Sequence, residues 1–340
     1  MVDKVGNITD NPTGRQVERQ TGISSASSNC LKGIFAICVL IHHLYQGSGL
    51  LHDTVIGGVL QAFGYLSVAC FFFLSGYGLY ASYQIKGRYY IKTFCRKKII
   101  PFYEVMCLFI AIYFLANTIY GQNISIWVLI KSLTFGGTII GNGWYLQVQL
   151  VLYLLFYITF RYAKEDRAIP CIIGECMSMC IILYLCGFES TWYEGIMAFP
   201  LGMVWCRYQD KLNFLKKGRI TFSVAITAFM FVCTCFGLSR ILPNEIISVI
   251  CKSMSAVIFP IVVVVIVSWI SIENNVTCIL GRYSMEIYIL QGLFLSMFHQ
   301  PLINIENPYM YVLMVMIFVG IGAVITHPIT SRIYSSARRK

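Results

Sequence analysis

Charged residues are scarce in this sequence. Asp, Glu, Lys and Arg together make up 12% of the 340 residues, against about 25% in soluble domains, which excludes an ordinary soluble enzyme. The 14 cysteines form no paired Cys-x-x-Cys motifs with zinc spacing. Most of them lie inside apolar runs, where a thiol behaves as a small hydrophobic group. We therefore predict no metal site and no disulfide framework.

Acidic residues are the rarer charge, 15 against 26 Lys and Arg. A basic chain can bind nucleic acid, but here the basic residues gather in short segments between long apolar runs. That arrangement is typical of the cytoplasmic loops of a multi-pass membrane protein. We therefore expect contact with a lipid bilayer and no binding of nucleic acid.

Long apolar runs fill most of the chain, and hydrophobic types reach 57% of the residues. One transmembrane helix needs about 20 apolar residues, so the sequence predicts an all-α polytopic membrane bundle of about ten transmembrane helices. We place them at 33–51, 58–81, 100–120, 144–161, 169–187, 191–207, 220–238, 246–270, 278–298 and 308–328. The segment 122–142 has a short apolar part, contains Lys131 and is rich in Gly, which predicts an interfacial or re-entrant segment.

The basic residues also predict the orientation. With both termini in the cytoplasm, 23 of the 26 Lys and Arg residues fall on the inner side, as the positive-inside rule requires. We expect a multi-pass protein of the plasma membrane. Its parts would be a flexible cytoplasmic tail (1–29), a transmembrane domain (30–332) and a basic cytoplasmic tail (333–340).

The first apolar run, LKGIFAICVLIHH, contains Lys32 and His43, which are eleven residues apart. Eleven residues are almost three helical turns, so the two side chains share one face and lie about 16 Å apart along the axis. A histidine in mid-membrane is a functional candidate, because neutral imidazole can act as a general base. The alternative is a histidine that only hydrogen-bonds a neighbouring helix. His42 competes for the role but points about 100° away.

A second run reads FFFLSGYGLY and is followed, after a loop, by RKKIIPFY. Ser75 and Gly76 are small enough to permit close helix contact. A cluster of cations at the membrane surface is either a topology signal that contacts lipid phosphates or a phosphate site for an anionic cosubstrate. The cations of this cluster are Arg96, Lys97 and Lys98.

Four motifs, in this order, resemble those of the acyltransferase 3 family of membrane acyltransferases. The family places ten residues between an Arg or Lys and an essential His, a spacing that Lys32 and His43 match and His42 does not. The second motif is FFFLSGYGLY with RKKIIPFY. GNGWYLQVQLVLYLLFY and LGRYSMEIYILQG are similar to two later signatures, and together the motifs cover nearly all of residues 30–330.

The resemblance implies an enzyme that transfers an acyl group from cytoplasmic acyl-CoA, with acetyl-CoA as the expected cosubstrate and no permanently bound cofactor. The implied acceptor is a hydroxyl of a cell-surface or lipid-linked carbohydrate, as in O-acetylation of polysaccharides in a bacterial cell envelope. His43 would be the base, and Lys32 would be part of both the catalytic and the donor site. The phosphates of the donor would meet Lys32, Arg96, Lys97 and Lys98. Direct transfer and an acyl-histidine intermediate both remain open.

Other polar residues are candidate substrate contacts. Ser75 and Tyr77 are possible donors to the oxyanion. Asn142 could bind a hydroxylated acceptor beside Trp144, although Trp144 is also typical of the aromatic belt at a membrane surface. Glu286 is expected either in a structural ion pair or as the group that orients the cations of the donor site.

Two amides depart from the family pattern. Gln149 stands where some members carry Glu, and Gln291 stands where many members carry His. An amide cannot act as a base, so the resemblance places more of the chemistry on His43. It leaves Gln149 as a substrate contact.

Two further functions stay open. In a transporter or flippase for a glycan or small anion, Lys32 and His43 would bind substrate or relay protons. The chain shows no internal repeat, which disfavours an inverted-repeat transporter. A catalytically inactive relative that serves in assembly is the third possibility.

Overall fold

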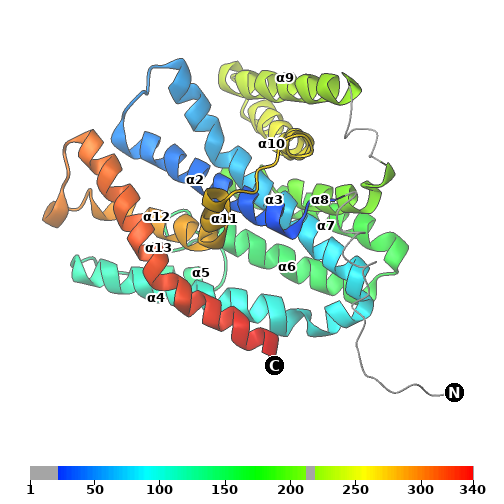
Figure 1. Cartoon of the computed structure of the whole chain (residues 1–340). Helices are drawn as coiled ribbons and strands as arrows, with labels where there is room; N and C mark the ends of the chain where they lie inside the picture. Colours follow the sequence, from blue (N-terminus) through cyan, green and yellow to red (C-terminus); the bar gives the residue numbers. More distant parts are fainter. Residues whose placement is uncertain (1–21, 212–218, 340) are drawn as a thin grey trace.

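The computed structural model describes residues 22–211 and 219–339, and every regular element in these two stretches is helical (Figure 1). The predicted all-α class is thus confirmed. The elements are α2 (Ser25–Ser48), α3 (Val55–Phe94), η1 (Cys95–Ile99), α4 (Ile100–Ile119), α5 (Ile126–Leu133), α6 (Trp144–Tyr162), α7 (Glu165–Leu185), η2 (Ser190–Trp192), α8 (Ala198–Tyr208), α9 (Arg219–Ile241), α10 (Glu245–Val267), α11 (Asn275–Arg282), α12 (Ser284–Met297), η4 (Pro301–Ile303) and α13 (Pro308–Arg339).

Six stretches of the described chain are long and apolar enough to cross a membrane. They are Ser25–Ser48, Val55–Ile119, Glu165–Leu185, Thr221–Ile241, Glu245–Val267 and Pro308–Arg339. Val55–Ile119 contains two predicted spans, so the six stretches account for seven of the ten. These stretches support a membrane protein with several helical spans, but they do not show the predicted count of ten.

The three remaining predicted spans differ from simple crossings. The 19-residue α6 is not among the six apolar stretches. The predicted span 191–207 contains the eleven-residue α8, which is only about 16 Å long. The span 278–298 is interrupted at Tyr283, whose backbone (φ −99°, ψ 6°) separates α11 from α12.

The start of α2 lies eight residues before the predicted edge of the first span. Ser24 caps the helix, because its Oγ accepts a hydrogen bond from the Ser27 backbone N–H at 2.8 Å. Glu273 accepts hydrogen bonds from the hydroxyls of Ser24 and Ser27 at 2.7 and 2.6 Å, and these bonds hold the pKa of the Glu273 carboxyl below its usual range. Lys32 therefore lies two turns inside a helix that is tied to the loop before α11.

Helices extend into both of the segments predicted as tails. Residues 25–29 belong to α2, and residues 1–21 lie outside the described residues. At the other end, α13 continues to Arg339 and includes most of the stretch 333–340.

The segment 122–142 folds around the eight-residue α5. A helix of that length is about 12 Å long, too short for a hydrocarbon core of about 30 Å, in line with the predicted interfacial or re-entrant segment. Gln147 fixes the following turn, because its Nε2 donates to the carbonyl oxygens of Lys131 (2.6 Å) and Gly137 (2.8 Å). Gly136 supplies the positive φ of 93° that the turn requires.

Helices α3 and α8 meet backbone to backbone. A Cβ on Gly76 would lie 2.0 Å from the Phe199 carbonyl oxygen, and a Cβ on Gly202 would lie 2.1 Å from that of Phe73. This is the close helix contact that the small residues of the second motif predict.

Aromatic rings join α2, α3, α6 and α12 in the centre of the bundle. Phe71 contacts Phe35 and Tyr288, with ring centroids 6.3 and 5.8 Å apart. Tyr145 contacts Tyr288 at 5.1 Å. These four helices, which lie together in Figure 1, carry most of the residues predicted for the site.

Candidate active site

His43 borders a small polar hollow at the end of α2. The hollow has a volume of about 410 Å³, and its lining comes from α2, the turn before α6, the end of α12 and the start of α13: His43, Gln46, Gly47, Gly141, Asn142, Gly292, Leu295, Ser296, His299 and Tyr311. His43 and Asn142, both predicted site residues, are thereby brought together. The other lining groups were not predicted. Gln46, Gly47 and Gly141 are sequence neighbours of the predicted pair, whereas the rest come from α12, the turn after it and α13, which are distant in sequence.

The hydrogen bond of His43 fixes which ring nitrogen is available. Its Nδ1 lies 3.2 Å from Oε1 of Gln46. An amide oxygen can only accept, so Nδ1–H is the donor and Nε2 keeps its lone pair. His43 is thus a half-buried imidazole beside a hollow, oriented as a general base must be.

His42 has a different environment although it is the adjacent residue. Its side chain is buried, and Nδ1 lies 3.0 Å from the Leu60 carbonyl oxygen. Its ring also packs on Gly64, where an added Cβ would come within 2.5 Å of it. His42 is a packing residue between α2 and α3, whereas His43 borders the hollow.

A basic cluster forms where the start of α2, the end of α3, η1 and the end of α13 meet. The charges of Lys32, Arg338 and Lys86 act on Lys98. Lys32 and Lys98 were predicted together, whereas Arg338 was missed because the sequence placed it in a tail. Arg96 is exposed on η1, and Lys97 is half-exposed there. They extend the positive surface beside the cluster.

Buried polar groups lie between these two regions. Gln149 Nε2 donates to Ser75 Oγ at 3.0 Å, and the Tyr145 hydroxyl donates to Gln149 Oε1 at 3.3 Å. Three further phenols, from α6, α12 and α13, interact electrostatically with Tyr145: Tyr153, Tyr288 and Tyr334. The predicted contacts Ser75 and Gln149 are therefore neighbours in the core.

The sequence model of the acyltransferase 3 family, described as an acyltransferase domain, matches residues 25–327. The chain belongs to this family. Family membership and the apolar helices together make it a membrane acyltransferase. Neither a curated protein nor a solved structure matches the chain.

The turn before α6 connects the hollow of the acyltransferase to the aromatic core. The Asn142 carbonyl oxygen accepts a hydrogen bond from the Tyr288 hydroxyl at 3.1 Å, and Asn142 has a positive φ of 59°. Next along the chain, Trp144 contacts Tyr145 and Trp192, with ring centroids 6.5 and 6.4 Å apart. The predicted acceptor contacts Asn142 and Trp144 thus lie at the same edge of the bundle.

Glu286 and Tyr77 lie apart from the hollow. Glu286 accepts from Nδ1 of His327 at 3.0 Å, which is the one ion pair within residues 22–211 and 219–339, and also from the Thr330 hydroxyl. This α12–α13 contact, and not a contact to the predicted cations, holds Glu286. The Tyr77 hydroxyl accepts from the Ile23 backbone N–H (2.9 Å) and donates to Gln209 Oε1 (2.8 Å).

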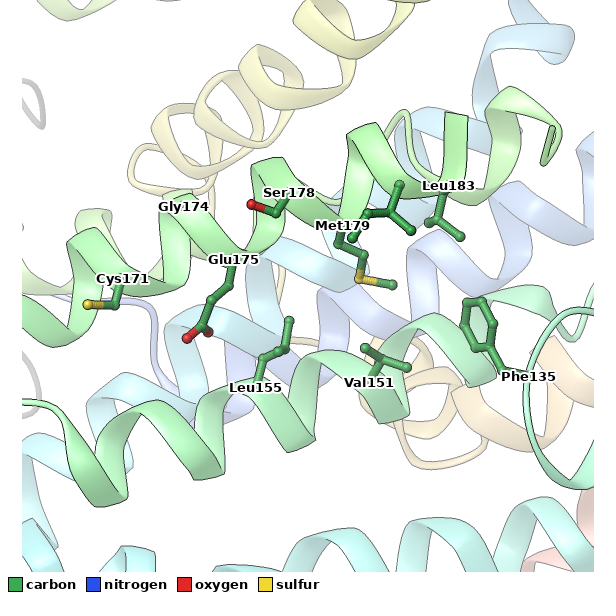
Figure 2. Close-up of a pocket in the computed structure, with 10 residues that line it drawn as sticks. Phe135, Val151, Leu155, Cys171, Gly174, Glu175, Ser178, Met179 and Leu183 are labelled. Atoms are coloured by element: carbon green, nitrogen blue, oxygen red, sulfur yellow. The ribbon is translucent and has the colours of Figure 1, made fainter. Parts of the chain in front are cut away.

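A larger groove runs between α6 and α7 (Figure 2). Its volume is about 750 Å³, and its lining is apolar except for Glu175 and Ser178. The Glu175 carboxylate points towards α6 and accepts from the Thr159 hydroxyl at 2.7 Å. The groove is lined by none of the predicted site residues, whereas the smaller hollow is lined by His43 and Asn142.

Proposed function

We propose that this acyltransferase moves an acyl group, with acetyl as the expected one, from cytoplasmic acyl-CoA to a hydroxyl of a cell-surface or lipid-linked carbohydrate. The observation that carries the proposal is His43, whose Nε2 is free beside a hollow of about 410 Å³. The hollow has polar groups from four segments of the chain, among them Asn142 and Ser296. Such groups can bind the hydroxyls of a sugar.

The donor would bind at the basic cluster. Phosphates pair well with Arg and Lys, and Lys32, Lys98 and Arg338 gather there from three separate elements. Lys32 and His43 stand on the same helix about 16 Å apart. The pantetheine arm of CoA can extend over a distance of this order, so a thioester could approach His43 while its phosphates stay at the cations.

The proposed reaction is a direct transfer. His43 Nε2 takes the proton of the acceptor hydroxyl, and the hydroxyl oxygen attacks the thioester carbonyl carbon. The carbon–sulfur bond then breaks, and the proton passes from His43 to the departing thiolate, which leaves as CoA. An acyl-histidine intermediate would instead form when His43 itself attacks the thioester.

The proposed orientation places the basic cluster at the cytoplasm and the hollow at the opposite side of a plasma membrane. The inside excess of Lys and Arg supports it. This arrangement would explain why the enzyme spans the membrane, because the donor and the acceptor would remain on opposite sides and meet inside the bundle.

The test uses purified protein in nanodiscs with radiolabelled acetyl-CoA and extracted envelope glycolipids and glycans. We expect His43→Gln to lose about 10²–10⁴-fold in label transfer while it still binds acetyl-CoA. His52→Gln is the matched control, since His52 is exposed and bonds only the Tyr45 carbonyl oxygen. Equal transfer by wild type and His43→Gln would overturn the proposal. Movement of glycan without CoA release would support a transporter in its place.

A further inference from the structure

Gln291 is a buried amide without a hydrogen-bond partner. It is fully buried on α12, and neither Oε1 nor Nε2 has a partner. Among the side chains that the structure describes, it is the one with two such buried atoms. Burial of an unsatisfied polar group costs free energy, and most buried amides in proteins are bonded. An amide left free in this way indicates a ligand that supplies the missing partners.

The position of Gln291 relates it to the reaction centre. Residues three and four apart lie on one face of a helix, so Gln291 shares its face with Tyr288 and Leu295. Leu295 lines the hollow beside His43. On the other side, the ring of Tyr288 packs on Tyr145 within the aromatic core. Gln291 therefore lies one helical turn inward of the hollow.

The neighbouring backbone holds this part of α12 against the turn before α6. A Cβ on Gly292 would lie 2.7 Å from the Gly141 Cα. The Tyr288 hydroxyl bonds the Asn142 carbonyl oxygen on the same side. These contacts fix the α12 backbone on both sides of Gln291, so the amide is held in place. Because the amide is fully buried, an acyl chain would have to displace neighbouring side chains to reach it.

We propose that the Gln291 amide binds the carbonyl oxygen of the acyl group and donates to the oxyanion that forms during transfer. The inference rests on the proposed function and assigns a further residue to its site. A thioester that arrives from the basic cluster would reach Gln291 before the hollow, while the acceptor hydroxyl would reach His43 from the outer side. The carbonyl carbon would then lie between the amide and the base.

The chemistry suits an amide better than an ionisable group. When the acceptor oxygen adds to the carbonyl carbon, the carbonyl π electrons move to oxygen, and an N–H donor stabilises that charge. The amide stays neutral and keeps its N–H donors at every pH. His43 is therefore the one group that would accept the proton of the acceptor hydroxyl and pass it to the thiolate. The hydrogen bond from the amide to the negatively charged oxyanion is stronger than the bond to the neutral carbonyl oxygen, so the amide favours the transition state over the bound ground state.

The test compares wild type with Gln291→Leu, which keeps the approximate volume and removes the donors. We expect kcat to fall about 100-fold, in the range found for lost oxyanion donors, with the KM for acetyl-CoA within about twofold of wild type. Thermal stability should be equal or higher, because an unpaired buried amide is removed. Gln147→Leu is the control for stability, since Gln147 Nε2 is bonded to two carbonyls in α5 and its turn, and it should melt lower.

Two results would overturn the inference. A Gln291→Leu enzyme with kcat within twofold of wild type would show that the amide does not act in transfer. A clear loss of thermal stability with unchanged kcat per folded molecule would show that the amide is bonded within the fold. If wild type itself releases no CoA and transfers no label, both the proposed function and the inference fail. If wild type is active and Gln291→Leu is equally active, the inference alone fails.

Discussion

At the scale of single residues, two adjacent histidines have opposite environments. His43 faces a hollow with Nε2 free, whereas His42 is buried against Gly64 and bonded to the Leu60 carbonyl oxygen. Adjacent positions on a helix point about 100° apart, so a difference of one residue separates a histidine at the hollow from one packed between helices. The separation of eleven residues between Lys32 and His43 also favours His43 over His42 as the functional candidate.

This contrast predicts the effect of replacing His42. In His42→Ala the Leu60 carbonyl loses its side-chain hydrogen bond and the ring leaves a void, so the free energy of unfolding should fall by about 1–3 kcal/mol. The folded fraction should keep turnover within a few-fold of wild type, because His42 does not line the hollow. Thermal unfolding in detergent, with turnover per folded molecule, measures both. Loss of turnover in a fully stable variant would instead make His42 the base.

At the scale of elements, the α3–α8 crossing depends on glycine. We predict that Gly76→Ala destabilises the fold by at least about 1–3 kcal/mol, because the new Cβ would lie 2.0 Å from the Phe199 carbonyl oxygen and force the helices apart. Gly78→Ala is the matched control. It lies two residues on in the same helix with nothing within 4 Å of its Cβ position, so it should be neutral or slightly stabilising. Unfolding of both variants in one detergent tests the pair, and a Gly76→Ala protein as stable as the control contradicts the crossing.

Helix type and the presence of a close helix contact at Gly76 follow from sequence because both are local signals, whereas α8 as the partner helix does not. Apolar runs mark α2, α3, α9, α10 and α13, and small residues mark the crossing. The break at Tyr283 and the early start of α2 do not follow. The first comes from the way that α11 packs on α2, where a Cβ on Gly281 would lie 2.3 Å from the Asn29 carbonyl oxygen, and the second from a cap shared with Glu273. Both are contacts between segments about 250 residues apart.

In the candidate site, too, some residues could be predicted from local sequence and others could not. Lys32 and His43 follow from spacing on one helix, and Arg96 to Lys98 from a basic run. The roles that we propose for Arg338 and Gln291 could not be predicted from the sequence. Their significance lies in what surrounds them, a basic cluster in one case and the absence of a bonded partner in the other.

At the scale of the whole molecule, the two ends of the bundle have different chemistry. The start of α2 and the end of α13 bring cations together at one end, whereas the opposite end of α2 borders the hollow. Aromatic and polar side chains from α3, α6 and α12 fill the space between them. The proposed path of the acyl group thus follows the long axis of α2.

This polarity predicts a role for Arg338 in donor binding. Arg338→Gln removes one cation that acts on Lys98, so we expect the Kd for acetyl-CoA to rise about tenfold, equivalent to about 1.4 kcal/mol, with a weaker dependence of Kd on salt. The kcat at saturating donor should be unchanged, since Arg338 lies at the opposite end from His43. Arg332→Gln is the matched control, because Arg332 is exposed on the same helix and lies on another face. Isothermal titration at two salt concentrations, followed by turnover assays, measures both variants. Equal Kd values for Arg338→Gln and Arg332→Gln would mean that the phosphates of the donor do not bind at the end of α13.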